Sequence, residues 1–487
     1  MIDKLHLESL EKKASALEPT QEVLNGWLEQ SNRYAKEFLE ERKTDLSFGK
    51  EFSKRNLLEA LPFSEEARPI TELIPVLKDG VDDPGVRPSS PGHLGYIPGG
   101  GLYSAAVGDF IAAFTNNYAG IYFGSPGAVK MENMIIQWMI EMVGYPATAF
   151  GNLPSGGSIA NLIAIVTARD ALSITSHKVR QSVVYLTHQT HHCVQKALNL
   201  AGLSECIIRQ ISVDDRFMMN TNQLQEQINN DKIDGLNPFM VVASCGTTDA
   251  GAVDDFESIG QIANEANCWF HIDAAYGGFF LLVDSMSDLF KGVELSDSIV
   301  MDPHKTMFLP YGSGAVLIKS VEKLQAAHHM EANYLQDVYD DNPEISPADV
   351  SPELTKHFRG LRMWLPLQLH GVGAFRAALQ EKHLLALYFY EEVQKLGFKV
   401  GPVPQLSVCM YRYDSGNLDQ DNQNNMDLSV RIRENTRFFI STTTINEVVW
   451  LRVAIVIFRT HISHMNEYLS ILKKESLDLV TVDKIHS

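Results

Sequence analysis

The chain has little of what membrane proteins and nucleic-acid-binding proteins need. Its 487 residues contain no uninterrupted apolar run of membrane-spanning length. Lysine and arginine number 41 against 60 aspartates and glutamates, and the resulting net charge of −19 disfavours nucleic acids and anionic membrane surfaces as partners. The charged N-terminus has no apolar core of signal-peptide length. We therefore expect a cytoplasmic protein that binds neither nucleic acid nor a membrane.

Cysteine is also scarce, and its distribution excludes two further classes of site. The five cysteines are odd in number and lack the close paired spacing of zinc sites, so we expect buried reduced thiols. A glycine-rich fingerprint directly after a first strand, with an acidic residue about twenty positions later, is absent from the sequence, which argues against a nicotinamide-dependent oxidoreductase. The cysteines are Cys193, Cys206, Cys245, Cys268 and Cys409.

The distribution of apolar residues predicts three regions. Residues 1–92 have the pattern of charged helices and end in a Pro/Gly-rich run. Residues 93–365 alternate helical stretches with short apolar runs, which is typical of an α/β domain with a mostly parallel sheet covered on both faces. Residues 366–487 are expected to form a small α+β domain. The runs predicted to be strands of the large sheet are 182–186, 239–243, 269–273, 297–301 and 314–318.

Two polar segments are expected to connect these elements. Residues 328–353 are acidic and contain prolines, and they are expected to form a long mobile loop. Long loops in compact domains are commonly functional lids. Residues 414–425 are predicted to be a polar spacer in the C-terminal domain.

Lys305 is unusual because its neighbours are apolar. It lies between the predicted strands 297–301 and 314–318, on a connection that Pro303 restricts. Lysine ordinarily keeps its ammonium group in water. If this lysine is buried, loss of hydration lowers its pKa and makes the neutral amine a nucleophile toward a carbonyl. The flanking residues alone leave both interpretations open.

Asp273 ends the predicted strand 269–273. A buried carboxylate needs a partner. It could cap a turn, or it could keep a heteroaromatic nitrogen protonated, with Ala275 small enough to let a flat ring lie against it. Asp273 and Lys305 are separated by one predicted strand-helix-strand unit, which would place both at the same end of the sheet, where ligands of such sheets bind.

Two further segments fit a phosphorylated aromatic ligand. A Ser/Gly run at 155–158 opens a predicted helix, where free N–H groups bind phosphate, although serine and glycine also cap helices routinely. The histidines of 188–192 could bind a metal, stack on a ring or serve structural hydrogen bonds; no carboxylate lies at ligand spacing, so no metal site is predicted. A lysine, an aspartate, a phosphate cradle and a stacking histidine together indicate pyridoxal 5′-phosphate.

These motifs resemble the group II pyridoxal-phosphate decarboxylases, the family of aromatic amino-acid, histidine, glutamate and diaminobutyrate decarboxylases. The resemblance implies a fold type I enzyme with a mostly parallel seven-stranded sheet, an N-terminal helical segment and a small α+β C-terminal domain. It extends from about residue 70 to 465. Its most specific parts are SGGSIAN (155–161), HQTHH (188–192), GTTDAGAVD (246–254), HIDAAYGG (271–278), DPHK (302–305) and FRGLRMW (358–364).

The resemblance also implies roles for individual residues. Lys305 would be the Schiff-base lysine, and Asp273 would pair with the pyridine nitrogen. His191 would stack on the ring, with His192 as the alternative. Tyr334 matches a catalytic tyrosine that reaches into the neighbouring subunit's site, and tyrosine at this position favours decarboxylation over aldehyde synthesis. Gly157, Ser158 and His304 would hold the phosphate, while Thr248 and Ala275 would line the ring.

The substrate is less clearly indicated than the cofactor. Tyr96 and Pro98 match the pattern of animal aromatic decarboxylases, whereas Gly99 begins a glycine run that is expected to open the site, and Tyr118 lies in a pocket segment that departs from that pattern. An aromatic L-amino acid is favoured; an acidic or aliphatic substrate, an aldehyde synthase and a non-catalytic relative are the alternatives. The resemblance further implies a homodimer whose N-terminal helices embrace the partner and whose sites lie between subunits.

Overall fold

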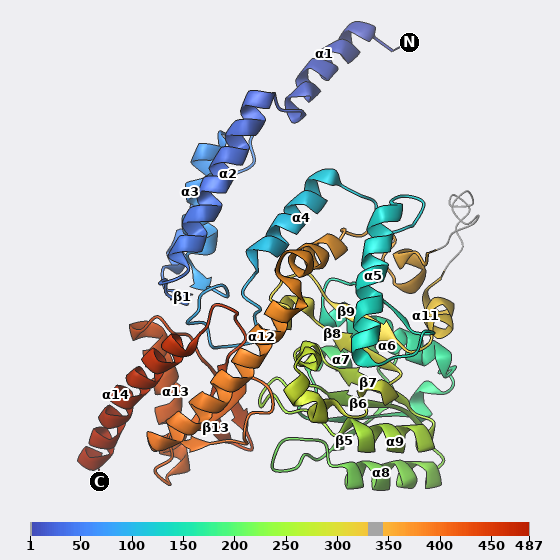
Figure 1. Ribbon diagram of the computed structural model, residues 1–487, viewed down its shortest axis with the longest axis vertical. Coiled ribbons are helices and arrows are strands. Elements are labelled where there is room, and N and C mark those ends of the chain that lie inside the picture. Colours follow the sequence, from blue (N-terminus) through green and yellow to red (C-terminus); the bar gives the residue numbers. More distant parts are fainter. Residues whose placement is uncertain (1, 330–343, 487) are drawn as a thin grey trace.

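The computed structural model describes residues 2–329 and 344–486. Its N-terminal helices extend away from the rest of the chain in Figure 1. Helices α1 (Lys4–Ala14), α2 (Gln21–Glu41) and α3 (Ile70–Leu77) contain no buried residue, and the side chains of Asp3 and Thr20 cap the first two. Strands β1 (Phe48–Gly49) and β2 (Gly85–Val86) pair antiparallel near the start of the main body.

The large domain is built on a mostly parallel sheet, as predicted. Within the described residues seven strands follow the order β3-β9-β8-β7-β6-β4-β5, and β9 alone runs antiparallel to its neighbours. The five predicted strands are confirmed, while β3 and β5 were not predicted. The strands are β3 (Phe150–Asn152), β4 (Ser182–Thr187), β5 (Ile207–Ile211), β6 (Asn237–Ser244), β7 (Trp269–Asp273), β8 (Ser298–Met301) and β9 (Ala315–Ile318).

Helices cover both faces of this sheet, because side chains that alternate along its strands enter two separate cores. On β7, Phe270 and Ile272 join the core formed with α5, α8 and α9, whereas Trp269 joins the core formed with α6, α7 and α11. The helices of the domain are α4 (Tyr103–Thr115), α5 (Pro126–Val143), α6 (Gly157–Ala171), α7 (His192–Leu200), α8 (Thr221–Ile233), α9 (Phe256–Ala266), α10 (Pro303–Thr306) and α11 (Val321–His328).

Two connections in the large domain differ from expectation. The link from β7 to β8 consists of 3₁₀ turns at 278–282, 284–290 and 293–295 rather than an α-helix. The acidic segment expected as a mobile loop lies partly outside the described residues; from Glu344 onward it packs on the domain, where Glu344 accepts a hydrogen bond from Asn133 Nδ2 at 2.8 Å.

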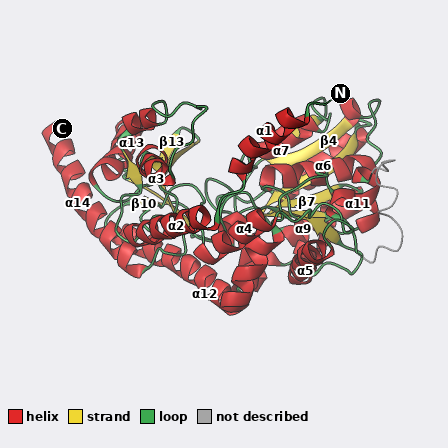
Figure 2. Cartoon of the chain, turned by 90° about the horizontal axis from the view of Figure 1, so that it is seen from above, coloured by secondary structure: helices red, strands yellow, loops and turns green. Residues whose placement is uncertain are grey.

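The C-terminal unit carries its own antiparallel sheet, visible in Figure 2 as a separate group of strands. The expected boundary between residues 365 and 366 falls inside helix α12 (Gly360–Lys395), which is interrupted at Gly371. Most of the expected polar spacer belongs to α13 (Leu418–Asn435), where Asn417 caps the first turn. The remaining elements are β10 (Lys399–Val400), β11 (Val408–Arg412), β12 (Ser441–Ile445), β13 (Val448–Ala454) and α14 (Ile462–His486). Among the described helices, a segment with the length and hydropathy of a membrane span is absent.

Candidate active site

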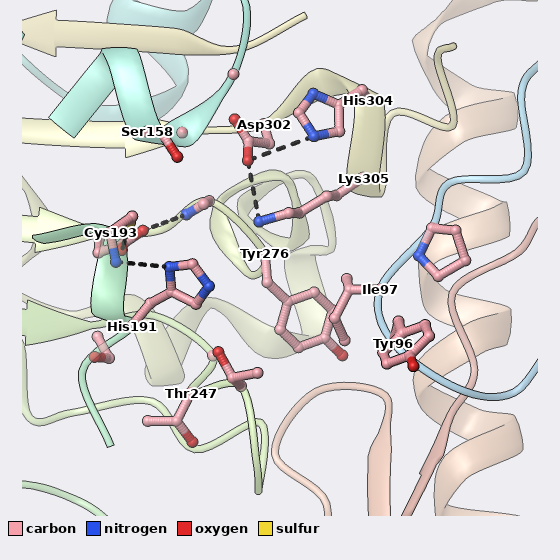
Figure 3. A pocket seen from close by; sticks show the side chains of 18 of the residues that line it. Tyr96, Ile97, Ser158, His191, Cys193, Thr247, Tyr276, Asp302, His304 and Lys305 are labelled. Atoms are coloured by element: carbon pink, nitrogen blue, oxygen red, sulfur yellow. Dashed lines mark hydrogen bonds and ion pairs between the residues drawn. The ribbon is translucent and has the colours of Figure 1, made fainter. Parts of the chain in front are cut away.

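A cavity of about 540 Å³ lies at the carboxyl ends of the central parallel strands. Figure 3 shows His191 and Cys193 on one side of it and Tyr96 and Ile97 on the other, with Lys305 between them. Most of the predicted site residues line this one cavity: Tyr96, Pro98, Gly157, Ser158, His191, Thr248, Asp273, Ala275, His304 and Lys305. Gly99 and Tyr118 are not among its described lining residues, and Tyr334 lies outside the described part of the chain.

Lys305 lies on the short helix α10 and pairs with an aspartate that was not predicted as a site residue. Its Nζ is 3.0 Å from Oδ2 of Asp302, one helical turn earlier. Burial disfavours the charged ammonium, but the nearby carboxylates of Asp302 and Asp273 outweigh it, so the pKa of Lys305 is raised above its ordinary value. The expected lowering of this pKa is therefore wrong: apolar neighbours do not make this amine neutral while Asp302 faces it.

Asp273 ends β7 as predicted and is buried. Its Oδ1 accepts a hydrogen bond from Ala275 N at 3.2 Å, and its Oδ2 faces Asn161 Nδ2 at 3.5 Å. Because β7 pairs parallel with β8, and Asp273 lies opposite Val300, the carboxylate and Lys305 leave the sheet at the same end. The site therefore places an amine and a carboxylate on one cavity without pairing them directly to each other.

The start of α6 forms a cradle without bulky side chains. No side chain of the described residues caps this helix, so its first N–H groups are available to a ligand. A Cβ on Gly157 would lie 2.9 Å from Asp302 Oδ2, and one on Gly156 would lie 3.2 Å from His304 Cε1. Ser158 belongs to the first turn of α6 and lines the cavity together with His304, whose pKa is lowered by burial. These features fit a phosphate group.

His191 lies at the other side of the cavity and caps the start of α7. Its Nδ1 accepts a hydrogen bond from Cys193 N at 3.3 Å, which fixes the ring at the start of the helix. Burial lowers the pKa of His191, against the opposing effect of the Asp273 carboxylate. The neighbouring ring of His192 lies 4.1 Å away, between centroids, and His192 is not among the described lining residues.

Arg452 lines the cavity and was not predicted. It extends from β13 of the C-terminal unit and is only 4% exposed. Nε donates to Asp249 O at 3.1 Å and Nη1 to Ser441 Oγ at 3.0 Å, whereas Nη2 has no hydrogen-bond partner among the described residues. A charged residue inside an apolar strand was the available signal, but only the fold shows that this strand meets the site.

The loop after β6 was also predicted incompletely. Thr247, beside the predicted Thr248, lines the cavity and is the buried member of the pair. Tyr276 lines it as well, and its hydroxyl group pairs with Ser407 Oγ at 2.6 Å. Burial raises the pKa of Tyr276 to about 12, so the phenol is neutral at physiological pH.

Fold and site together define a fold type I pyridoxal-phosphate enzyme: the amine, the carboxylate and the free helix start match the aldehyde, the ring nitrogen and the phosphate of that cofactor. The pyridoxal-dependent decarboxylase conserved domain matches residues 57–410, and the chain belongs to that family. It is a pyridoxal-phosphate-dependent amino-acid decarboxylase.

The chain is similar to decarboxylases and to aldehyde synthases of this family. An aromatic-L-amino-acid decarboxylase from Bacillus atrophaeus is 32% identical over 429 residues, which cover 86% of this chain and 88% of that protein. A phenylacetaldehyde synthase from Arabidopsis thaliana is 26% identical over an aligned region that covers 80% of this chain and 82% of that protein. The structure of Oryza sativa TDC with PLP and tryptamine has the same fold, with a TM-score of 0.89 at 23% identity, and covers 95% of this chain and 99% of that one.

Proposed function

We propose that this enzyme decarboxylates an aromatic L-amino acid to the corresponding amine and CO2. The observation that carries the proposal is the wall of the cavity formed by Tyr96, Ile97 and Pro98. Figure 3 shows Tyr96 and Ile97 across from His191. Tyr96 is 58% exposed and has a φ of 53°, a left-handed conformation that costs a non-glycine residue energy. An apolar wall with an aromatic edge suits an aromatic side chain. The Bacillus relative, by its name, acts on this class of substrate.

Gly99 supports this wall rather than opening it. A Cβ at this position would lie 2.5 Å from Lys305 O and 2.6 Å from His304 O, so the glycine lets the wall segment approach the backbone of α10. The expectation that the glycine run widens the site therefore does not hold at Gly99, because the space beside it is already filled by main chain.

The residues that line the cavity support the following cofactor roles. Lys305 would be the covalent anchor, Asp273 would hold the proton on the ring nitrogen and His191 would lie against the ring. When bound, pyridoxal phosphate supplies the electron sink for the loss of CO2. Gly157, Ser158 and His304 would hold the phosphate, and Thr248 and Ala275 would line the ring. Tyr334 is proposed to deliver the proton that replaces CO2, which would distinguish amine formation from aldehyde synthesis.

One observation favours a second candidate, an acidic amino acid. Arg452 lines the cavity, and one nitrogen of its buried guanidinium group has no hydrogen-bond partner among the described residues. Such a group suits a carboxylate, because charge-assisted pairing would satisfy the free N–H groups. A substrate with a carboxylate on its side chain could pair that carboxylate with Arg452. With an aromatic substrate, only water or the α-carboxylate of the substrate could contact Arg452.

We also propose a cytoplasmic homodimer with sites between subunits. Large apolar side chains are exposed on helices that do not bury them in the described chain, such as Val23 and Trp27 on α2 and Phe110 and Phe114 on α4. Exposed apolar surface of this kind marks a protein interface. Tyr118 lies outside the cavity of its own chain, so it would reach a substrate pocket only across such a dimer. Light scattering tests this proposal, which predicts twice the 54.3 kDa chain mass.

The substrate is tested by a product screen. Purified holoenzyme is incubated separately with tryptophan, tyrosine, phenylalanine, dihydroxyphenylalanine, glutamate, aspartate and diaminobutyrate, and CO2 and organic products are measured. Aromatic amines are the expected products; turnover confined to acidic substrates, and lost in Arg452→Met, would establish the second candidate instead. An aldehyde as the main product from the aromatic substrates would contradict simple decarboxylation.

A further inference from the structure

A continuous series of buried side-chain contacts leads to Asp273. Trp269 Nε1 donates to Ser298 Oγ at 2.7 Å, and the same hydroxyl group lies 2.8 Å from His271 Nδ1. His271 Nε2 lies 2.7 Å from Asn161 Oδ1, and Asn161 Nδ2 faces Asp273 Oδ2 at 3.5 Å. Trp269, His271 and Asp273 alternate along β7 and therefore share the face that α6 covers.

The direction of these hydrogen bonds is fixed at both ends. The indole N–H can only donate, so Ser298 Oγ accepts it, which leaves the hydroxyl proton available to donate to His271 Nδ1. His271 is fully buried, and burial lowers its pKa to about 4, so the ring is neutral and carries its single proton on Nε2. That proton goes to Asn161 Oδ1. The amide nitrogen of Asn161 then faces both Cys193 Sγ, at 3.4 Å, and Asp273 Oδ2, at 3.5 Å.

Asn161 also connects Asp273 to the phosphate cradle. Its Nδ2 donates to Gly157 O at 2.9 Å, on the first turn of α6. The reversed amide would place an oxygen against this carbonyl and against the Asp273 carboxylate, which is unfavourable at both contacts. One buried amide thus joins the residue assigned to the ring nitrogen with the helix start assigned to the phosphate.

We propose that Asn161, oriented by His271, is a positioning residue that aims the Asp273 carboxylate at the cofactor's ring nitrogen and keeps it in register with the start of α6. A neutral donor at this place orients the carboxylate without neutralising it, so the negative charge remains available to a protonated ring. The proposal rests on the cofactor site of the proposed function but is independent of which amino acid is the substrate.

Two substitutions of His271 separate orientation from simple packing. The amide nitrogen of His271→Gln can replace Nε2 as the donor to Asn161, whereas His271→Asn is too short to reach it. Asn161→Leu removes the positioning amide while it keeps a similar volume. The measurements are the dissociation constant of pyridoxal phosphate from each apoenzyme and the visible absorption of the bound cofactor as a function of pH, neither of which requires turnover.

The expected result is a loss of cofactor affinity of about tenfold to a hundredfold in Asn161→Leu and His271→Asn, the range of one hydrogen bond to a charged group. Both variants should also shift the pH dependence of the cofactor's absorption, and His271→Gln should restore both properties. Thr167→Val is the matched control, because it removes a buried bond of the same kind on the same helix, from Thr167 Oγ1 to Ile163 O at 2.8 Å. Its affinity and spectrum should equal those of the wild type.

Three outcomes would overturn the proposal. The first is wild-type affinity and absorption in Asn161→Leu, and the second is an equal loss in His271→Gln and His271→Asn. The third is a loss in Thr167→Val as large as that in Asn161→Leu, which would show general damage to α6. Melting temperatures of the apoenzymes identify any variant that fails to fold. If Asn161→Leu fails to fold, the comparison of His271→Gln with His271→Asn still tests the proposal, and if either His271 variant fails, Asn161→Leu still tests it. If the product screen finds a non-aromatic substrate while these variants behave as expected, only the substrate assignment fails.

Discussion

Nζ of Lys305 lies 3.0 Å from Oδ2 of Asp302, and this carboxylate lies directly beneath the start of α6. The other oxygen of Asp302 has no hydrogen-bond partner among the described residues. The ion pair keeps the lysine charged, although attachment to an aldehyde requires the neutral amine. The lysine must therefore lose a proton and leave Asp302 before it can bind the cofactor.

Removing this carboxylate should ease attachment of the cofactor. In Asp302→Asn the pKa of Lys305 should fall, because the closest charge that favours the ammonium is gone. The rate at which pyridoxal phosphate attaches to the apoenzyme, followed by absorbance, should then reach its maximum at a lower pH than in the wild type. Asp288→Asn is the control, since Asp288 pairs with Lys291 at the same spacing on the surface. An unchanged or upward-shifted pH profile in Asp302→Asn would contradict the role of this pair.

Gly99 should tolerate no side chain. In Gly99→Ala the new Cβ would meet the backbone oxygens of Lys305 and His304, and main chain cannot move aside as a flexible side chain can. We expect a loss of about 1–3 kcal/mol in the free energy of unfolding, together with weaker cofactor binding. Urea unfolding and cofactor titration measure the two effects. Gly127→Ala should show neither, because a Cβ at Gly127 meets no atom within 4 Å, and equal behaviour of the two variants would refute the close approach.

Acid should destabilise the protein through its buried histidines. Burial lowers the pKa of His93 from 6.5 to about 4. As the pH falls below 6.5, the imidazole of His93 is therefore protonated in the unfolded chain but not in the folded chain. The contribution of His93 to the free energy of unfolding is therefore fully present above pH 6.5. It decreases by up to about 1.4 kcal/mol for each pH unit as the pH falls from 6.5 to about 4. In His93→Phe, a ring that cannot ionise, the apoenzyme's melting temperature should fall less over this pH range. A fall as steep as in the wild type would show that His93 is not responsible.

The placement of Lys305 and Asp273 on one cavity could be predicted from the sequence because it depends on local strand patterns. Lys305 and Asp273 each follow a recognisable apolar strand, and parallel pairing of those strands brings them to one edge of the sheet. Asp302 was missed because its contact with Lys305 depends on a helical turn where only a connection was predicted. The sign of the Lys305 pKa shift was wrong for the same reason, since burial was considered without the carboxylate that opposes it.

Contacts between distant segments lay beyond what one sequence shows. Arg452 reaches the cavity from the C-terminal unit, and Asn161 on α6 meets His271 on β7, which lies 110 residues later in the chain. Strand β3 has three residues, too few for a periodic pattern, and β5 is a partly exposed edge strand. The first turns of α13, residues 418–425, were mistaken for a spacer because they are almost entirely polar, and packing rather than composition decides their conformation.

The most direct test of the account is to identify the residue that binds the cofactor. Holoenzyme is reduced with borohydride, which makes the bond between pyridoxal phosphate and its lysine permanent, and the digested protein is analysed by mass spectrometry. If Lys305 binds the cofactor, we expect one modified peptide, which carries the cofactor on Lys305, and no such peptide in Lys305→Ala. Cofactor attached to a different lysine, or bound at full occupancy without any covalent attachment, would contradict it.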